Sequence, residues 1–188
     1  MEGNVSANCR TSSKTVNDFV LAGIKAYNEG NMQNALNQLT RALDLSNDAG
    51  IYGIRCLCRY RDGDTTDAMN DVNKAISIDP KFSLFYLIRG LFHQKESKNK
   101  EAIDDFTNVL SMTPEMVSAY AWRGISKYRL KEYDAALEDF TVAFNSPAVK
   151  CSPSWENVIR NLAKEEKGDN GYLKKLIEMS QRIIPACG

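Results

Sequence analysis

The side chains best suited to chemistry are the five cysteines and the single histidine. Cys56 and Cys58 are two residues apart, which on a helix places them about 200° apart around the axis, so their thiolates cannot reach one metal ion. His93 has no carboxylate or cysteine motif around it, and we interpret it as a packed structural residue. The sequence also contains no glycine-rich phosphate loop and no nucleophile elbow. These features predict a protein that is not an enzyme and that needs no cofactor and no metal.

The composition of the chain indicates the cellular compartment and excludes some classes of binding partner. An odd number of cysteines, with Cys9, Cys151 and Cys187 far apart, is not typical of a disulfide framework and favours a reducing compartment. The 24 basic and 24 acidic residues cancel, so no overall field attracts nucleic acid or an anionic membrane. No apolar run is long enough to span a bilayer, and the N-terminus lacks the apolar core of a secretory signal. We expect a cytoplasmic protein without nucleic-acid or membrane partners.

The sequence contains an internal repeat, whose helices would position the cysteines and the histidine. Segments starting at Tyr52, Tyr86 and Tyr120 align without gaps at equal spacing, and an earlier copy starts at Phe19, one position short of the same spacing. Matching positions carry small residues (Gly23, Cys56, Gly90, Gly124), alanines (Ala35, Ala68, Ala102, Ala136) and larger apolar residues (Leu39, Val72, Phe106, Phe140). Turn residues punctuate the copies, and the pairs Asp79-Pro80 and Thr113-Pro114 predict capped helix starts with proline at the first helical position.

This pattern resembles the tetratricopeptide repeat (TPR), in which each unit of about 34 residues is a pair of antiparallel helices. The resemblance implies an all-α, right-handed superhelical α-solenoid. We expect four repeats over residues 16–150, at about 16–48, 49–82, 83–116 and 117–150. Residues 1–15, polar and without periodicity, are expected to form a disordered tail. Residues 151–188 show helical periodicity without the repeat signature and are expected to form a divergent capping helix pair.

Charged residues also recur with the repeat. An arginine on the first helix is followed sixteen positions later by an aspartate on the second, whereas the first copy has Ala22 and Gln38 there. Because both members are present or absent together, we predict an ion pair inside each unit. The predicted pairs are Arg55 with Asp71, Arg89 with Asp105, and Arg123 with Asp139. The rival interpretation is an arginine ladder for acidic ligands.

The resemblance further implies that the first helices line a concave surface that binds extended peptides or partner helices. Transferred position by position, that surface is apolar with an aromatic and basic margin. Its predicted residues are Leu21, Ile24, Tyr27, Ile54, Leu57, Tyr60, Arg61, Ile88, Leu91, Lys95, Trp122, Ile125, Tyr128 and Arg129. Alternatively, some of these residues pack against neighbouring helices or are covered by the chain's own termini.

Family members that grip the C-terminal tails of heat-shock chaperones use a carboxylate clamp of lysine, asparagine and arginine. Here the clamp positions read Val20, Ile24, Ile54, Leu84 and Ile88, or Gly53, Leu57, Ile88, Ser118 and Trp122 in the shifted frame. Neither set offers the polar groups for a terminal carboxylate. We therefore predict a scaffold or adaptor that binds a protein segment or peptide in an apolar groove. The alternative is homo-oligomerisation through the same surface or through the C-terminal helix. The sequence does not identify the partner.

Overall fold

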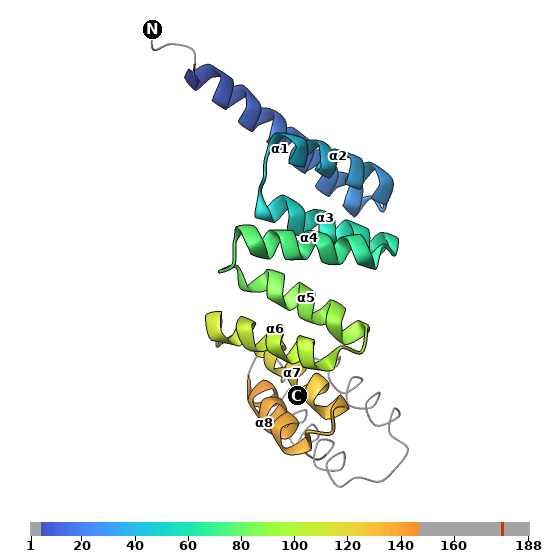
Figure 1. Cartoon of the computed structure of the whole chain (residues 1–188), viewed down its shortest axis with the longest axis vertical. Coiled ribbons are helices and arrows are strands. Elements are labelled where there is room, and N and C mark those ends of the chain that lie inside the picture. The colour runs from blue at the N-terminus through green and yellow to red at the C-terminus, as the bar shows by residue number, and fades with distance from the viewer. Residues whose placement is uncertain (1–4, 147–177, 179–188) are drawn as a thin grey trace, which may run out of the picture. The chain divides into compact units, whose positions relative to one another are not determined.

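The computed structural model describes residues 5–146 and residue 178, with side chains described from residue 15 onward (Figure 1). This part of the chain is helical and contains no strand. Its helices are α1 (Val5–Asn28), α2 (Met32–Leu45), α3 (Ala49–Asp62), α4 (Thr65–Ile78), α5 (Ser83–Lys95), α6 (Asn99–Met112), α7 (Val117–Arg129) and α8 (Tyr133–Asn145). The pairs α1–α2, α3–α4 and α7–α8 pack together, as do α2–α3 and α6–α7. The expected all-α fold of paired helices is confirmed.

Polar side chains and left-handed glycines mark the ends of the helices in the first two pairs. The Oδ1 atom of Asn31 accepts a hydrogen bond from the backbone N–H of Asn34 (3.1 Å) and caps α2. Asp64 caps α4 through the N–H of Asp67 (3.0 Å). Gly63 ends α3 with φ 94°, a left-handed conformation that glycine adopts without a steric penalty. The short turns thus follow from local side-chain chemistry.

The prolines do not stand where the sequence analysis places them. Helix α5 begins at Ser83 and α7 at Val117, so Pro80 and Pro114 lie in the preceding turns and not at a first helical position. The Oδ1 atom of Asp79 accepts from the N–H of Lys81 (3.2 Å), which closes a local turn instead of capping a helix. The prediction was wrong because aspartate followed by proline also starts a turn.

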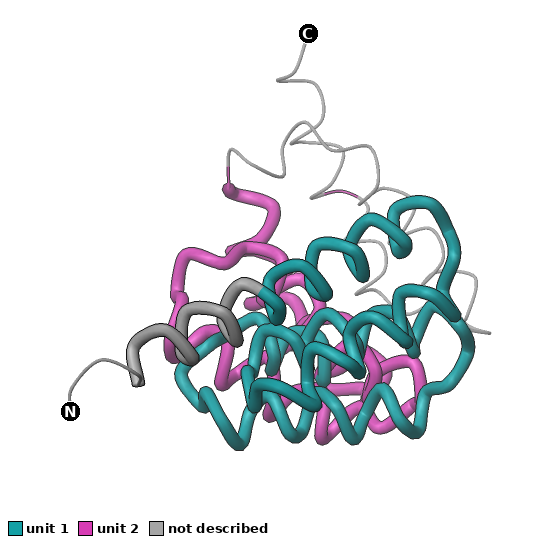
Figure 2. The backbone as a smooth tube through the Cα atoms, turned by 90° about the horizontal axis from the view of Figure 1, so that it is seen from above, with its two compact units in different colours: residues 1–89 teal, residues 90–188 magenta. Residues whose placement is uncertain are grey.

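The chain divides into two compact units, residues 1–89 and residues 90–188, which are coloured separately in Figure 2. In the first unit, α1–α3 enclose a core cluster of Ala26, Ala35, Leu39, Ala42, Ile51 and Cys58. In the second, the glycines of the repeat lie against phenylalanine rings: a Cβ on Gly90 would come within 2.8 Å of Phe106, and one on Gly124 within 3.0 Å of Phe140. The small positions therefore let the two helices of a repeat approach each other closely.

Helix α1 begins at Val5 and so enters the segment 1–15 that the sequence analysis expects to be disordered. No glycine or proline interrupts the sequence from Val5 to Ala22, which leaves the helix free to extend. The expected capping helices of residues 151–188 lie outside the described residues, apart from residue 178. Within the described residues, none of the helices combines the length and the hydropathy needed to cross a bilayer.

Candidate functional site

The first unit presents an apolar face formed by α1 and α3. Leu21 is 65% exposed and Leu57 is 39% exposed. Ile24 of α1 and Ile54 of α3 are half-buried, and Ile54 packs against the core cluster of this unit. We call these four residues the α1–α3 face. On this face Leu21 and Leu57 are exposed to solvent, whereas Ile54 is packed against the core.

A basic margin borders this face. The guanidinium of Arg61 lies over the ring of Tyr27, 5.0 Å from its centroid, and its Nη1 donates to the carbonyl oxygen of Tyr27 (3.4 Å). Arg61 nevertheless remains exposed, so its charge is available to an acidic group. Tyr60, the residue before it on α3, is half-buried. The structure thus brings Tyr27 of α1 and Arg61 of α3 into contact.

The same repeat positions behave differently on α7 in the second unit. Trp122 is half-buried and Arg129 is exposed, but Ile125 and Tyr128 are each only 3% exposed. The ring of Tyr128 packs edge-on against Tyr133 of α8, with centroids 5.3 Å apart. The structure therefore corrects the expectation that Ile125 and Tyr128 line an open groove, because these side chains are used for packing.

Helix α5 contributes to the second unit through a buried amide. Gln94, 7% exposed, donates from Nε2 to the carbonyl oxygen of Trp122 (3.1 Å) and to the hydroxyl of Ser126 (2.9 Å). These bonds tie α5 to α7 where the first two repeats have tyrosine. Of the other predicted residues on α5, Ile88 and Leu91 are half-buried and Lys95 is exposed.

The repeated arginines and aspartates form buried charge clusters. Arg55 holds Asp71 with two hydrogen bonds, Nε to Oδ2 (2.9 Å) and Nη2 to Oδ1 (2.7 Å), and Arg59 adds a second cation at 2.8 Å. In the second unit, Asp139 receives the same pair of bonds from Arg123, and Lys127 lies 2.8 Å from its Oδ2. Each of these two buried carboxylates is thus neutralised by two cations that lie one helical turn apart on the first helix.

Electrostatics within the cluster keep the arginine charged. The hydrogen bonding of Arg123 to Asp139, in which the guanidinium donates, raises the pKa of Arg123, and this effect outweighs the burial that opposes the charge. The side chains of Arg55 and Arg123 are only 13% and 17% exposed. An arginine ladder for acidic ligands needs accessible guanidinium groups, so this arrangement favours the structural interpretation.

Sequence reasoning missed a further bond of each arginine. Nη1 donates to a polar residue on the second helix of the preceding repeat. The acceptors are Thr40 for Arg55 (3.2 Å), Asn73 for Arg89 (2.9 Å) and Thr107 for Arg123 (3.2 Å). These acceptors recur with nearly the spacing of the repeat, which was a readable signal.

The two cysteines of α3 are buried. Cys56 and Cys58 are free thiols with no exposed surface. Burial raises the pKa of Cys56 to about 12 and that of Cys58 to about 11. The part of the chain that the structure describes contains no group of three or more histidine, cysteine or acidic residues arranged for a metal ion.

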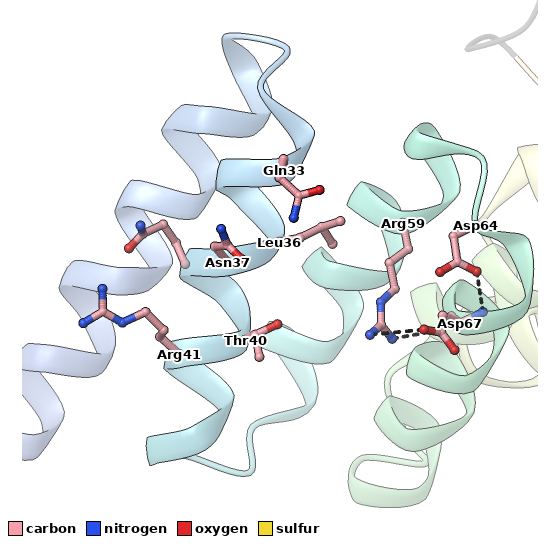
Figure 3. Close-up of a pocket in the computed structure, with 9 residues that line it drawn as sticks. Gln33, Leu36, Asn37, Thr40, Arg41, Arg59, Asp64 and Asp67 are labelled. Carbon is pink, nitrogen blue, oxygen red and sulfur yellow. Dashed lines mark hydrogen bonds and ion pairs between the residues drawn. The ribbon is translucent and has the colours of Figure 1, made fainter.

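A polar pocket lies between α2 and the α3–α4 pair (Figure 3). On one side Gln33, Asn37 and Arg41 extend from α2, and on the other Arg59 is held by its ion pair with Asp67 (3.5 Å). Arg41 is already stacked on Phe19, 4.3 Å from the ring centroid. Of the other charged residues in this pocket, Arg59 is paired with Asp67 and Asp64 accepts a hydrogen bond from the backbone N–H of Asp67.

The comparisons with known proteins concern the fold. No protein-family model matches the chain, and no curated protein matches it significantly. The chain does match solved structures. The MamA RS-1 ArsTM double mutant superposes on it with a TM-score of 0.73 at 16% sequence identity, and the match covers 92% of this chain and 96% of the MamA chain. The first TPR of Spaghetti (RPAP3), bound to the HSP90 peptide SRMEEVD, gives 0.60 at 21% identity, covering 63% and 98%. YrrB, a TPR protein with an unusual peptide-binding site, gives 0.62 at 16% identity, covering 71% and 69%.

These similarities establish a common architecture, and the helix pairs that recur in step with the sequence repeat agree with it. The chain has the tetratricopeptide-repeat fold.

Proposed function

We propose that the chain is a non-catalytic scaffold or adaptor that binds an apolar peptide or amphipathic helix of another protein on the α1–α3 face. The observation that carries this proposal is the exposure of Leu21 on α1 and of Leu57 on α3, helices that also carry the half-buried Ile24 and Ile54. Several apolar side chains exposed on one face of a soluble helical protein mark an interaction surface. Peptide binding by the first TPR of RPAP3 supports the same use of the fold.

The margin of the face specifies the partner further. Arg61 is exposed and held over Tyr27, so a carboxylate next to the partner's apolar residues would meet a fixed positive charge. We therefore propose an amphipathic partner segment with acidic residues beside its apolar side. On α5 and α7 the corresponding candidates are Ile88, Leu91, Lys95, Trp122 and Arg129. The buried free thiols of α3 support a reducing location such as the cytoplasm.

We also propose that the chain does not bind a terminal carboxylate through a clamp. The clamp positions on α1 and α3 carry Val20, Ile24 and Ile54, which have no hydrogen-bond donor in their side chains. The test is fluorescence anisotropy with labelled SRMEEVD, the peptide bound by the first TPR of RPAP3, which serves as the positive control. We expect no saturable binding to this chain. Binding that is lost when the peptide's C-terminus is amidated would contradict the proposal.

The face itself is tested by an affinity pull-down with quantitative mass spectrometry. The double variant Leu21→Glu/Leu57→Glu should lose specific partners because it places two charges on the apolar face. The matched control is Leu45→Glu, which changes a leucine of α2 that is 49% exposed and should keep the same partners. Circular dichroism verifies that both variants remain helical. Equal recovery of all partners by both variants would rule out the face as the binding site.

The alternative occupant of the face is a second copy of the chain, since the same exposed leucines could pack against their symmetry mates. Light scattering over a tenfold dilution distinguishes the two. A dimer that dissociates on dilution and disappears in Leu21→Glu/Leu57→Glu would favour homo-oligomerisation. A monomer at every concentration would exclude it.

A further inference from the structure

The wall that α2 contributes to the polar pocket of Figure 3 carries two side-chain amides that are open to a ligand. Gln33 and Asn37 are exposed, and neither side chain makes a hydrogen bond with another described residue. They lie about one helical turn apart. Arg41 follows one turn later, exposed and stacked on Phe19. This side of α2 therefore offers hydrogen-bond donors, acceptors and one fixed positive charge to a ligand.

The equivalent positions in the later repeats differ in chemistry. In the second repeat, the amide of Asn70 replaces that of Asn37 and already donates to Oδ1 of Asp67 (3.4 Å). In the third and fourth repeats both positions carry charged residues that are exposed, namely Lys100 and Asp104 on α6, and Asp134 and Glu138 on α8. Such charges are typical of the solvated face of a helix. Among the four repeats, only the first has two unpaired amides here.

The pocket is an open groove rather than an enclosed cavity. Its volume is about 530 Å³, and Leu36 extends from α2 toward the α3–α4 pair and is half-buried. Most of the remaining wall is exposed, namely Gln33, Asn37, Thr40, Arg41 and Asp64. A small-molecule site usually buries most of its ligand's surface, whereas a peptide can lie along a groove with one side in water. The shape therefore favours a peptide.

The spacing along α2 fits an extended main chain. Asn37 lies about 6 Å along the helix axis from Gln33, and Arg41 lies about 12 Å from it. In an extended peptide, residues two apart are separated by about 6.6 Å and residues four apart by about 13 Å. Each side-chain amide has a donor and an acceptor, so it can bond the N–H and the C=O of a peptide's main chain. The two amides thus match alternate residues of an extended segment.

The two ends of the groove carry opposite charges. Asp64 lies toward the end marked by Gln33, and Arg41 lies toward the other end (Figure 3). Asp64 is exposed, and its Oδ1 caps α4 through the N–H of Asp67 (3.0 Å), which leaves Oδ2 for a cation. A basic and an acidic residue four positions apart in an extended segment would therefore each meet the opposite charge.

We propose that this groove, formed by α2 and the α3–α4 pair, binds an extended peptide segment of another protein. Gln33 and Asn37 bond the main chain of the segment, and Leu36 contacts an apolar side chain. Asp64 and Arg41 select a basic and an acidic residue at its two ends. The groove shares no residue with the α1–α3 face, so the chain holds two segments by different means.

The test is an NMR titration of the full chain, labelled with nitrogen-15, with the heptapeptide TKTVTET blocked at both ends. We expect the side-chain amide signals of Gln33 and Asn37 to shift and to saturate. Gln33→Ala/Asn37→Ala should weaken binding about tenfold and remain folded, because alanine suits an exposed helical position. The matched control Asn108→Ala changes an exposed asparagine of α6 and should bind as the wild type does. Signals that do not saturate, or equal affinities of the double variant and the wild type, would overturn the proposal.

Two further titrations identify what is recognised and where. The same heptapeptide N-methylated at its three central residues keeps every side chain but loses three N–H donors, and it should bind about tenfold more weakly. Equal binding of the two peptides would contradict recognition of the main chain. Leu21→Glu/Leu57→Glu should bind TKTVTET as the wild type does, so a failure of the α1–α3 face leaves this groove intact. Binding that is lost in this variant and kept in Gln33→Ala/Asn37→Ala would place the peptide on the α1–α3 face and refute the proposal.

Discussion

The α1–α3 face of the first unit and the α7 surface of the second use the same repeat positions in opposite ways. Leu57 on α3 and Ile125 on α7 are equivalent in the repeat, yet the first is 39% exposed and the second 3%. Tyr60 is half-buried, whereas its equivalent Tyr128 packs on Tyr133. A position in a repeat therefore determines which way a side chain points, and the packing around it determines whether the side chain is available to a partner.

The largest effect should come from placing a charge at these equivalent positions. Ile125→Glu buries a carboxylate without a partner and should lower the free energy of unfolding by more than about 3 kcal/mol. Leu57→Glu leaves its carboxylate in contact with solvent and should cost less than about 1 kcal/mol. Urea denaturation followed by circular dichroism measures both. Similar losses for the two variants would mean that the difference in exposure does not exist in solution.

Each unit contains a buried aspartate that is paired with two cations. These two similar clusters provide the second test. Asp71→Ala and Asp139→Ala each leave two cations without their carboxylate, so each should cost about 2 to 4 kcal/mol of unfolding free energy. The double variants Arg55→Met/Asp71→Leu and Arg123→Met/Asp139→Leu should be less destabilised than the single ones, since each also removes one of the two cations that the single variant leaves without a carboxylate. Thermal and urea unfolding give the values. A loss confined to one unit would show that the clusters are not equivalent.

The smallest effect concerns the thiols beneath the open face, on either side of Leu57. Because burial raises the pKa of Cys56 to about 12 and of Cys58 to about 11 from an ordinary 9.0, the unfolded chain releases these protons first as the pH rises. Stability should therefore fall above about pH 9, by about 1 kcal/mol per thiol at pH 10. The comparison is urea unfolding at pH 8 and pH 10. Cys56→Ala/Cys58→Ala should lose less stability over that interval than the wild type, and an equal loss would refute the assignment.

Much of the fold was readable from the sequence because the repeat constrains each position several times over. The repeat pairs a small residue, Gly90, with a large ring, Phe106, and this pairing predicts the contact that the structure contains. The ring occupies the space that a side chain at position 90 would need. The pairing of Arg55 with Asp71 was readable for a related reason: both are missing from the first copy. Covarying positions within one chain thus indicate contacts in the way that covarying positions between homologues do.

Exposure was harder to predict because it depends on residues that the repeat does not constrain. Nothing at position 125 itself distinguishes Ile125 from Leu57, and Tyr128 is buried through Tyr133, a residue outside the repeat signature. Gln94 breaks the tyrosine pattern, but its bonds to Trp122 and Ser126 depend on the approach of α7. The prediction made from the two proline pairs was wrong because such a dipeptide occurs both in turns and at helix starts. The candidate site was therefore predictable as a set of positions and not as a surface.

The arginine that reaches back to the preceding helix has a consequence for how such a chain can change in length. Its acceptors Thr40, Asn73 and Thr107 recur nearly in step with the arginines, so the joint between neighbours has the same chemistry each time. Excision of one full repeat, from Tyr52 to Phe85, would bring Arg89 to Thr40 and leave a bonded joint. Gain or loss of whole repeats by recombination thus preserves the hydrogen bond between neighbouring repeats. An insertion of any other length inside a repeat breaks it.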